Sequence, residues 1–138
     1  RAYEVKLYTK KSIHEWYKNT KSNFKKSDFY KIYIDFPRLE LIERINLRSK
    51  EMIKNGAIKE VKNFIKLKVK KDQSVNKAIG INEIKQYLNN EKELEEIIEN
   101  ISIKTRQYAK RQSTWARGNM NTWLKLKPNE LNNFLKKI

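Results

Sequence analysis

The chain has 138 residues, with 32 Lys and Arg against 16 Asp and Glu, so it is about one domain long and carries a formal net charge of +16. It has no cysteine and one histidine, His14, which excludes a disulfide framework, a cysteine-ligated zinc site and the paired histidines of metalloproteases. No apolar run approaches the roughly 18 residues of a membrane span, and the first residues are neither a signal peptide nor an initiator methionine. We therefore expect a cytoplasmic piece of a longer protein, with no membrane segment.

The first third of the chain is expected to hold two helices and a strand. The pattern predicts one helix over residues 1–19, followed by a polar loop at 22–26. Residues 30–36 alternate apolar and polar side chains, which is typical of a strand, and Pro37 ends it. A helix is then predicted over residues 38–55, because helical spacing separates Leu41, Ile45 and Met52.

The middle of the chain is expected to continue as helices. Gly56 is placed to end the preceding helix in a left-handed conformation. The next helix is expected to bury Ile58, Val61, Phe64 or Ile65, and Leu67. A basic connection at 66–74 follows, and residues 78–81 open a short helix that runs to Leu88 and stops at Asn89 and Asn90.

The longest predicted helix covers residues 92–117, about 39 Å at the usual rise per residue. Its charges are polarised, acidic at the start and basic at the end, as the helix dipole favours. Its inner stripe is expected to consist of Leu94, Ile98, Ile101, Tyr108 and Trp115. Residues 123–126 can form a short strand, and Pro128 begins a terminal helix that reaches Leu135.

The positive charge is segregated along the sequence. Residues 104–138 carry nine basic side chains and one acidic one, whereas residues 72–103 carry three basic and seven acidic ones. Such segregation indicates a surface that faces a polyanion, although ordinary solvated helix surfaces are the alternative. Because 25 of the 32 cations are lysines, the seven arginines are the better markers of places that need a planar, bidentate donor.

The end of the long helix carries the strongest candidate site. Spacings of four, three and four place Arg106, Lys110, Ser113 and Arg117 on one stripe, opposite Tyr108 and Trp115, which are expected to anchor the helix to the core. Such a stripe can bind a phosphate backbone, and the amides of Gln107 and Gln112 can read base edges. The alternative is a basic helix end favoured by its dipole alone.

Arg48 is a second candidate, because the apolar rhythm of its helix places position 48 on the inner face. An inward guanidinium needs an anion, which can be a pyrophosphate or a buried carboxylate of the protein itself. A third candidate is the segment 77–82, in which Gly80 precedes a short helix. The backbone amides there can bind phosphate, but an ordinary tight turn is the better interpretation from the sequence.

Taken in order, these segments resemble the C-terminal part of the tRNA dimethylallyltransferases, a family of P-loop isopentenyl transferases. Residues 1–5 resemble the family's Arg-Ala-Leu-Glu-Val, and residues 44–61 follow its Arg-Ile-x-x-Arg, Met-Ile, Gly and Glu-Val pattern. Residues 78–80 fit its Ala-Ile-Gly turn, and residues 105–115 fit its Thr-Arg-x-(Leu/Tyr)-Ala-Lys-Arg-Gln-x-Thr-Trp motif, which is specific. The resemblance implies an α/β fold class, here the mostly helical C-terminal portion of a P-loop NTPase-like fold with one or two short strands, as a single unit over residues 1–138.

The resemblance also implies the reaction, which is transfer of a dimethylallyl group from dimethylallyl diphosphate to N6 of the adenosine 3′-adjacent to the anticodon. The implied partners are the tRNA anticodon stem-loop and the diphosphate, with Mg²⁺ held mainly by the N-terminal portion, in a cytoplasmic monomer. The residue matching Arg48 contacts the diphosphate. The residues matching the family's tRNA-contacting segments are Arg1, Lys77, Gly80, Asn82, Arg106, Gln107, Lys110, Arg111, Gln112 and Ser113.

Two departures from the family pattern affect this interpretation. Ile81 and Asn82 follow Gly80 where the family has an aromatic and a basic residue. The family's phosphate loop and general-base aspartate lie upstream of the position matching Arg1, so we expect this chain alone to bind RNA without catalysing transfer, and to hold no metal itself. The runner-up is a non-catalytic RNA-binding module, and a basic scaffold protein would instead leave Arg48 fully solvated.

Overall fold

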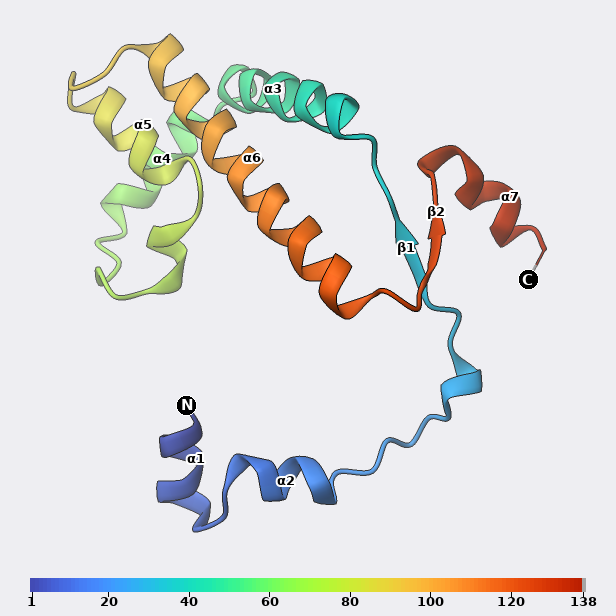
Figure 1. Cartoon of the computed structure of the whole chain (residues 1–138). Helices are drawn as coiled ribbons and strands as arrows, with labels where there is room; N and C mark the ends of the chain where they lie inside the picture. Colours follow the sequence, from blue (N-terminus) through green and yellow to red (C-terminus); the bar gives the residue numbers. More distant parts are fainter. Residues whose placement is uncertain (138) are drawn as a thin grey trace. The chain divides into compact units, whose positions relative to one another are not determined.

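The structure is a computed structural model of the chain, and it describes residues 1–137 (Figure 1). Its contacts divide the chain into two compact units, Arg1–Lys31 and Ile32–Ile138. The prediction that residues 1–138 form one portion of a larger enzyme stays a prediction.

The first unit holds two short helices, α1 (Ala2–Thr9) and α2 (Ile13–Asn19), and a 3₁₀ turn at Lys26–Asp28. The prediction of one helix over residues 1–19 is therefore wrong. Lys10 adopts a left-handed conformation with φ 58°, which ends α1. Ser12 then begins α2 through a capping box, in which the Ser12 N–H donates to Glu15 Oε2 (2.7 Å) and the Glu15 N–H donates to Ser12 Oγ (3.2 Å).

The second unit begins and ends with two short strands that pair in parallel. They are β1 (Ile32–Ile34) and β2 (Leu124–Leu126), with Ile32 opposite Leu124. Both predicted strands are confirmed, although β1 is shorter than the alternating segment. A parallel pair needs a long crossover connection, and here the four helices α3 to α6 provide it (Figure 1).

The four crossover helices contain the core. They are α3 (Arg38–Lys54), α4 (Ala57–Lys66), α5 (Ile81–Leu88) and α6 (Leu94–Asn119), and a 3₁₀ turn at Ser74–Lys77 precedes α5. The main cluster of buried side chains consists of Ala57, Val61, Ile84 and Ile97. Gly56 has φ +104° between α3 and α4, which confirms the predicted helix stop. Leu67 was expected inside but is 70% exposed, because α4 ends one residue before it.

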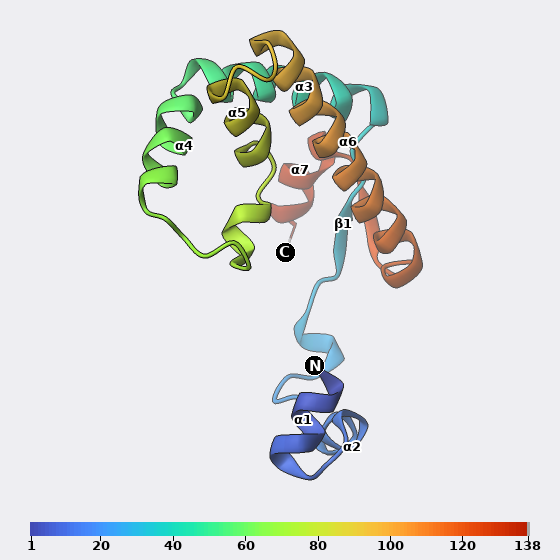
Figure 2. The ribbon, with the colours of Figure 1, turned by 90° about the vertical axis from the view of Figure 1, so that its left-hand side faces the viewer.

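Helix α6 packs against α3 and α5 only along its first part (Figures 1 and 2). There Ile97 and Ile101 are buried, with Ser102 beside them. Tyr108 and Trp115 were predicted to anchor the helix to the core, but they are 52% and 59% exposed, so that prediction is wrong. The second part of α6 extends past α4 and α5, where the core cluster does not reach (Figure 1).

The chain closes with a 3₁₀ turn at Pro128–Glu130 and the short helix α7 (Leu131–Leu135), as predicted. The predicted mostly helical chain with one or two short strands is thus confirmed. Of the helices that the structure describes, none combines the length and the apolar composition needed to cross a membrane.

Candidate nucleic-acid interface

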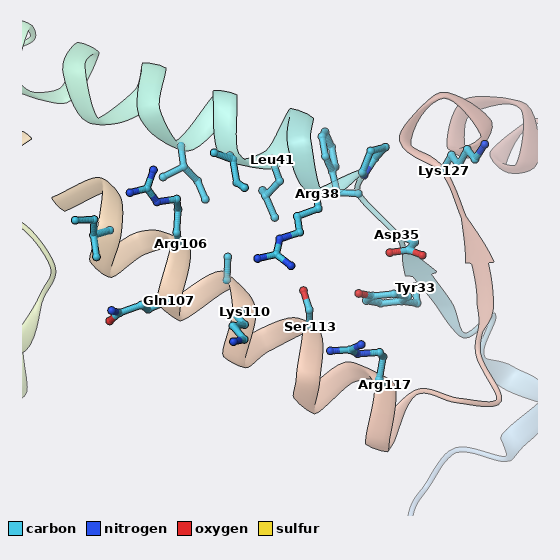
Figure 3. Close-up of a pocket in the computed structure, with 16 residues that line it drawn as sticks. Tyr33, Asp35, Arg38, Leu41, Arg106, Gln107, Lys110, Ser113, Arg117 and Lys127 are labelled. Carbon is cyan, nitrogen blue, oxygen red and sulfur yellow. The ribbon is translucent and has the colours of Figure 1, made fainter. Parts of the chain in front are cut away.

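A groove of about 850 Å³ lies between α6 and the segment that joins β1 to α3 (Figure 3). Apolar side chains of α3 and α6 line part of it, among them Leu41, Ile45 and Ile103. The other lining residues are mostly polar and cationic, namely Arg38, Arg106, Gln107, Lys110, Ser113, Arg117 and Lys127. The second unit therefore contains a concave surface that combines an apolar lining with several positive charges.

One wall of the groove is the stripe predicted from the spacing along α6. Arg106, Lys110, Ser113 and Arg117 all line the groove, and Figure 3 shows them following one side of the helix. Gln107 joins them at the same cavity. The prediction that these residues share one face is confirmed, because a helix of 3.6 residues per turn aligns positions three and four apart.

The opposite wall comes from segments that the sequence analysis did not connect with the site. Tyr33 belongs to β1, Asp35 follows it, Arg38 begins α3, and Lys127 follows β2. Figure 3 shows the Arg38 side chain crossing from α3 toward α6. The pairing of β1 with β2 places Lys127 near residues that precede it by about ninety positions in the chain. The local sequence does not signal this proximity. Of the two cations on this wall, only Arg38 stands out in the sequence, because arginine is rare in this chain.

The cations of the groove differ in their partners. Arg106 donates through Nη2 to Glu99 Oε1 (2.7 Å) and through Nη1 to Asn46 Oδ1 (3.4 Å), so it ties α6 to α3. Within residues 1–137, the side chains of the other four form no ion pair or hydrogen bond with the protein: Arg38, Lys110, Arg117 and Lys127. Their charges are therefore available to an anion in the groove.

A second cavity, of about 650 Å³, contacts a different side of α6. Tyr108, Arg111, Gln112 and Trp115 line it together with residues of β1, and Ser113 contributes to both cavities. The guanidinium carbon of Arg111 lies 6.0 Å from the centre of the Tyr108 ring. The predicted RNA-contacting segment is thus divided, with Arg111 and Gln112 on one side of the helix and Arg106 and Lys110 on the other.

Arg48 does not face inward, so the sequence prediction of its orientation is wrong. Its side chain is exposed, whereas Ser49 next to it is 3% exposed and donates through Oγ to the Ile45 carbonyl (2.9 Å). Consecutive residues lie about 100° apart around a helix. Since the packed face of α3 is centred near Ser49, Arg48 lies to its side and lines neither cavity.

The third candidate segment, around Gly80, lies apart from both cavities. Gly80 is buried with φ +104°, and its N–H donates to Glu83 Oε2 (2.9 Å). A Cβ at this position would lie 3.4 Å from Met52 Cε. This geometry favours the tight-turn interpretation, because the Gly80 amide already has a partner. Lys77 and Asn82 on either side of it are exposed.

Glu83 is a buried charged residue that the sequence analysis missed. It is 3% exposed, and its carboxylate accepts hydrogen bonds from the Gly80 N–H and from Lys104 Nζ. Burial by itself raises the pKa of this carboxyl. The hydrogen bonds from Lys104 and from the backbone, together with the positive charge of Lys104, lower the pKa by more than burial raises it, so the pKa is lowered overall. Glu83 therefore links the Gly80 turn to α6 two residues before Arg106.

Arg1 belongs to the first unit, where it precedes α1 and is exposed. This predicted site residue is thus part of the unit formed by Arg1–Lys31.

Known proteins match this chain over nearly its whole length. A tRNA dimethylallyltransferase of Pelagibacter ubique is 59% identical over 138 residues, which are 100% of this chain and 44% of that protein. One from Acetivibrio thermocellus is 38% identical over 117 residues, which are 85% of this chain and 37% of the relative. The chain thus spans less than half the length of these relatives.

Two crystal structures are also similar. The tRNA delta(2)-isopentenylpyrophosphate transferase of Staphylococcus epidermidis aligns with a TM-score of 0.69 and 28% identity, covering 99% of this chain and 47% of that one. The full-length tRNA isopentenylpyrophosphate transferase of Bacillus halodurans gives 0.65 and 32%, covering 90% and 42%. In addition, a sequence model of the IPP transferase family matches residues 1–119. The resemblance found in the sequence motifs is therefore confirmed, and the chain belongs to the IPP transferase family.

Proposed function

We propose that this chain is part of an enzyme that transfers a dimethylallyl group from dimethylallyl diphosphate to N6 of the adenosine 3′-adjacent to the anticodon of a tRNA. The observation that carries this proposal is the match to the family over residues 1–119, together with the 59% identical relative named tRNA dimethylallyltransferase. The cationic groove on α6 supports it, because a tRNA is a polyanion and phosphate contacts supply much of its binding free energy.

In this proposal the two sides of α6 contact the anticodon stem-loop differently. Arg106, Gln107, Lys110 and Ser113 line the cationic groove, which suits backbone phosphates and an exposed base edge. Arg111 and Gln112 line the second cavity beside Tyr108 and Trp115, where a planar aromatic surface suits an unstacked base. In the second unit, the exposed Lys77 and Asn82, with the turn at Gly80, are also proposed to contact the RNA. Arg1 is a proposed RNA contact of the first unit.

Arg48 is proposed to contact the diphosphate. During transfer the adenosine N6 attacks the allylic carbon, the carbon–oxygen bond to the diphosphate breaks, and N6 loses a proton. Negative charge grows on the departing pyrophosphate, and an arginine can offset it through two parallel N–H donors. Exposure of Arg48 in α3 leaves its guanidinium open to such a ligand. A scaffold protein would also expose Arg48, but the family match argues against a scaffold.

Mg²⁺ is the cofactor that the family implies. Among the described residues no group of three His, Cys, Asp or Glu side chains could hold a metal ion. The residues present here therefore do not fit a metal site, and we assign no step of the reaction to the metal through this chain. We also propose that the protein is a cytoplasmic monomer.

Incubating the intact protein with an anticodon stem-loop RNA and labelled dimethylallyl diphosphate tests the reaction. We expect label on the RNA, and none on a stem-loop in which guanosine replaces the target adenosine. The segment 1–138 alone, as a control, is expected to bind RNA without transferring the label. RNA binding by the intact protein without any transfer would refute the enzyme and support a non-catalytic RNA-binding module.

The same assay tests Arg48. Arg48→Ala in the intact protein should weaken diphosphate use, seen as a raised KM for dimethylallyl diphosphate and a lowered kcat, because one donor to the leaving group is lost. Arg48→Lys should recover part of the loss, since the charge stays but the bidentate geometry does not. Unchanged transfer kinetics with parental diphosphate affinity would show that Arg48 has no such role.

A further inference from the structure

We propose that Arg38 and Arg117 bind backbone phosphates of the RNA from the two opposite walls of the α6 groove. This inference rests on the proposed function, since it takes the ligand of the groove to be the tRNA. It adds two residues outside the set implied by the family motifs.

The fold brings these two arginines to one cavity from distant positions. Arg38 is the first residue of α3, directly after Pro37, and Arg117 lies near the end of α6. Both line the groove, and in Figure 3 the Arg38 side chain extends from α3 toward α6, where Ser113 and Arg117 lie one turn apart. A strand of RNA lying in the groove would therefore meet positive charge on both of its sides.

The cations of the groove differ in how much of their hydrogen-bonding capacity the protein already uses. Arg106 already has a carboxylate, Glu99, and an amide, Asn46, as partners, so much of its hydrogen-bonding capacity is used inside the protein. Arg38 and Arg117 have no ion pair or side-chain hydrogen bond among the residues described by the structure. An incoming phosphate can pair with them without breaking a contact within residues 1–137, whereas recruiting Arg106 would loosen the link between α6 and α3.

The charge balance of the groove favours a polyanion. Five cationic side chains line it, and Asp35 is the one acidic residue among the described lining residues. Charges of one sign inside a concave surface with apolar walls focus the field and raise the local concentration of an anion. The use of arginine at positions 38 and 117, in a chain with 25 lysines and seven arginines, suits the bidentate geometry of phosphate.

An RNA strand fits the remaining lining better than an acidic peptide does. The cations are spread along the groove over α3, α6 and the segment after β2, which suits evenly spaced phosphates. Beside them lie Leu41, Ile45 and Ile103, an apolar surface that an unstacked base can cover. Ser113 lies between Lys110 and Arg117 on the same face and offers a hydroxyl donor to a phosphate oxygen (Figure 3).

The test measures binding of a fluorescent anticodon stem-loop to the intact protein over a series of salt concentrations. Each lost phosphate contact should reduce the slope of log K against log salt by about 0.7 to 0.9, so Arg38→Gln and Arg117→Gln should each flatten it by that amount. Lys54→Gln removes the same charge from the exposed end of α3, outside both cavities, and should leave the slope at the parental value. Parental slopes in both arginine variants would overturn the inference.

Three further measurements keep that result interpretable. Thermal unfolding identifies any variant that loses binding because it unfolds, and Arg38→Lys and Arg117→Lys, which keep the charge, should restore most of the slope. Competition by polyglutamate as effective as competition by the stem-loop at equal charge would overturn the assignment to RNA. If the intact protein transfers no label but the salt slopes of the arginine variants are flatter than that of the parent, the proposed reaction is wrong and this inference stands. If label is transferred but the slopes are unchanged, the proposed reaction stands and this inference is wrong.

Discussion

At the scale of single residues, the partner of each charged group decides its role. Arg106 and Lys110 lie one turn apart on α6, yet Arg106 is held by Glu99 and Asn46 while Lys110 extends into the groove (Figure 3). Glu83 is the charged residue with the clearest structural role, because it is buried and accepts hydrogen bonds from both Gly80 and Lys104. Removing such a partner leaves a buried donor unsatisfied, which costs more than the bond itself contributes.

The lowered pKa of Glu83 makes part of the stability dependent on pH. A carboxyl whose folded pKa is lower than its unfolded value of about 4.5 stabilises the fold above that pH, and the contribution is lost as the pH falls through the folded pKa. Glu83→Gln should lower the free energy of unfolding at pH 7 by about 1.5 to 3 kcal/mol. The difference from the parent should shrink below pH 4.5.

Urea unfolding at a series of pH values checks this prediction. Glu43→Gln is the matched control, since Glu43 is exposed on α3 and outside both cavities, and its effect should stay within about 0.5 kcal/mol. A Glu83→Gln variant as stable as the parent at pH 7 would argue against a stabilising carboxylate at this site.

At the scale of elements, the helix ends marked by glycine were predicted, whereas the break at Lys10 and the packed face of α3 were not. Glycines and caps are local signals, so the stop at Gly56 and the short helix after Gly80 were found from the sequence. The side on which α3 packs depends on what lies beside it. The packed face of α3 is centred near Ser49. The prediction placed it at Arg48, because hydrophobic spacing alone leaves the direction of a helix face uncertain by about one residue, or 100°.

Gly80 gives a prediction at this scale. Gly80→Ala should destabilise the protein by about 1 to 2 kcal/mol, because φ +104° is strained for an L side chain and the new Cβ would approach Met52 Cε at 3.4 Å. Gly118→Ala is the control, and it is expected to change the stability in the opposite direction. Gly118 is helical with nothing within 4 Å of an added Cβ, so alanine there should stabilise by up to about 1 kcal/mol. Thermal unfolding of both variants measures the contrast, and equal shifts would contradict it.

At the scale of the whole molecule, the packing is concentrated in one place. The buried cluster lies where α4, α5 and α6 meet within the second unit, while no described residue of α1 or α2 is buried. The groove residues lie on the other part of α6, away from this cluster (Figures 1 and 3). The core can therefore fix the direction of α6 without occupying the surface that is proposed to contact RNA.

Ile97 tests how far the second unit depends on this core. It is 0% exposed, so Ile97→Ala should cost about 2 to 5 kcal/mol through lost burial and the cavity left behind. Ile65→Ala, at a side chain 43% exposed on α4, should cost about 1 kcal/mol or less. Chemical denaturation followed by helical circular dichroism compares the two, and similar losses would mean that the cluster is not the main core.

The sequence by itself determined the order and type of most elements, the family, and the stripe of Arg106, Lys110, Ser113 and Arg117 on one side of α6. These rest on local physics, namely turn residues and the helical repeat, and on specific motifs. Only the tertiary structure decided that Arg48 is exposed, that Tyr108 and Trp115 border a cavity instead of the core, and that Arg38 and Lys127 share a groove with α6. Those outcomes depend on which elements pack together, through contacts between residues far apart in the chain, and local spacing does not encode such contacts.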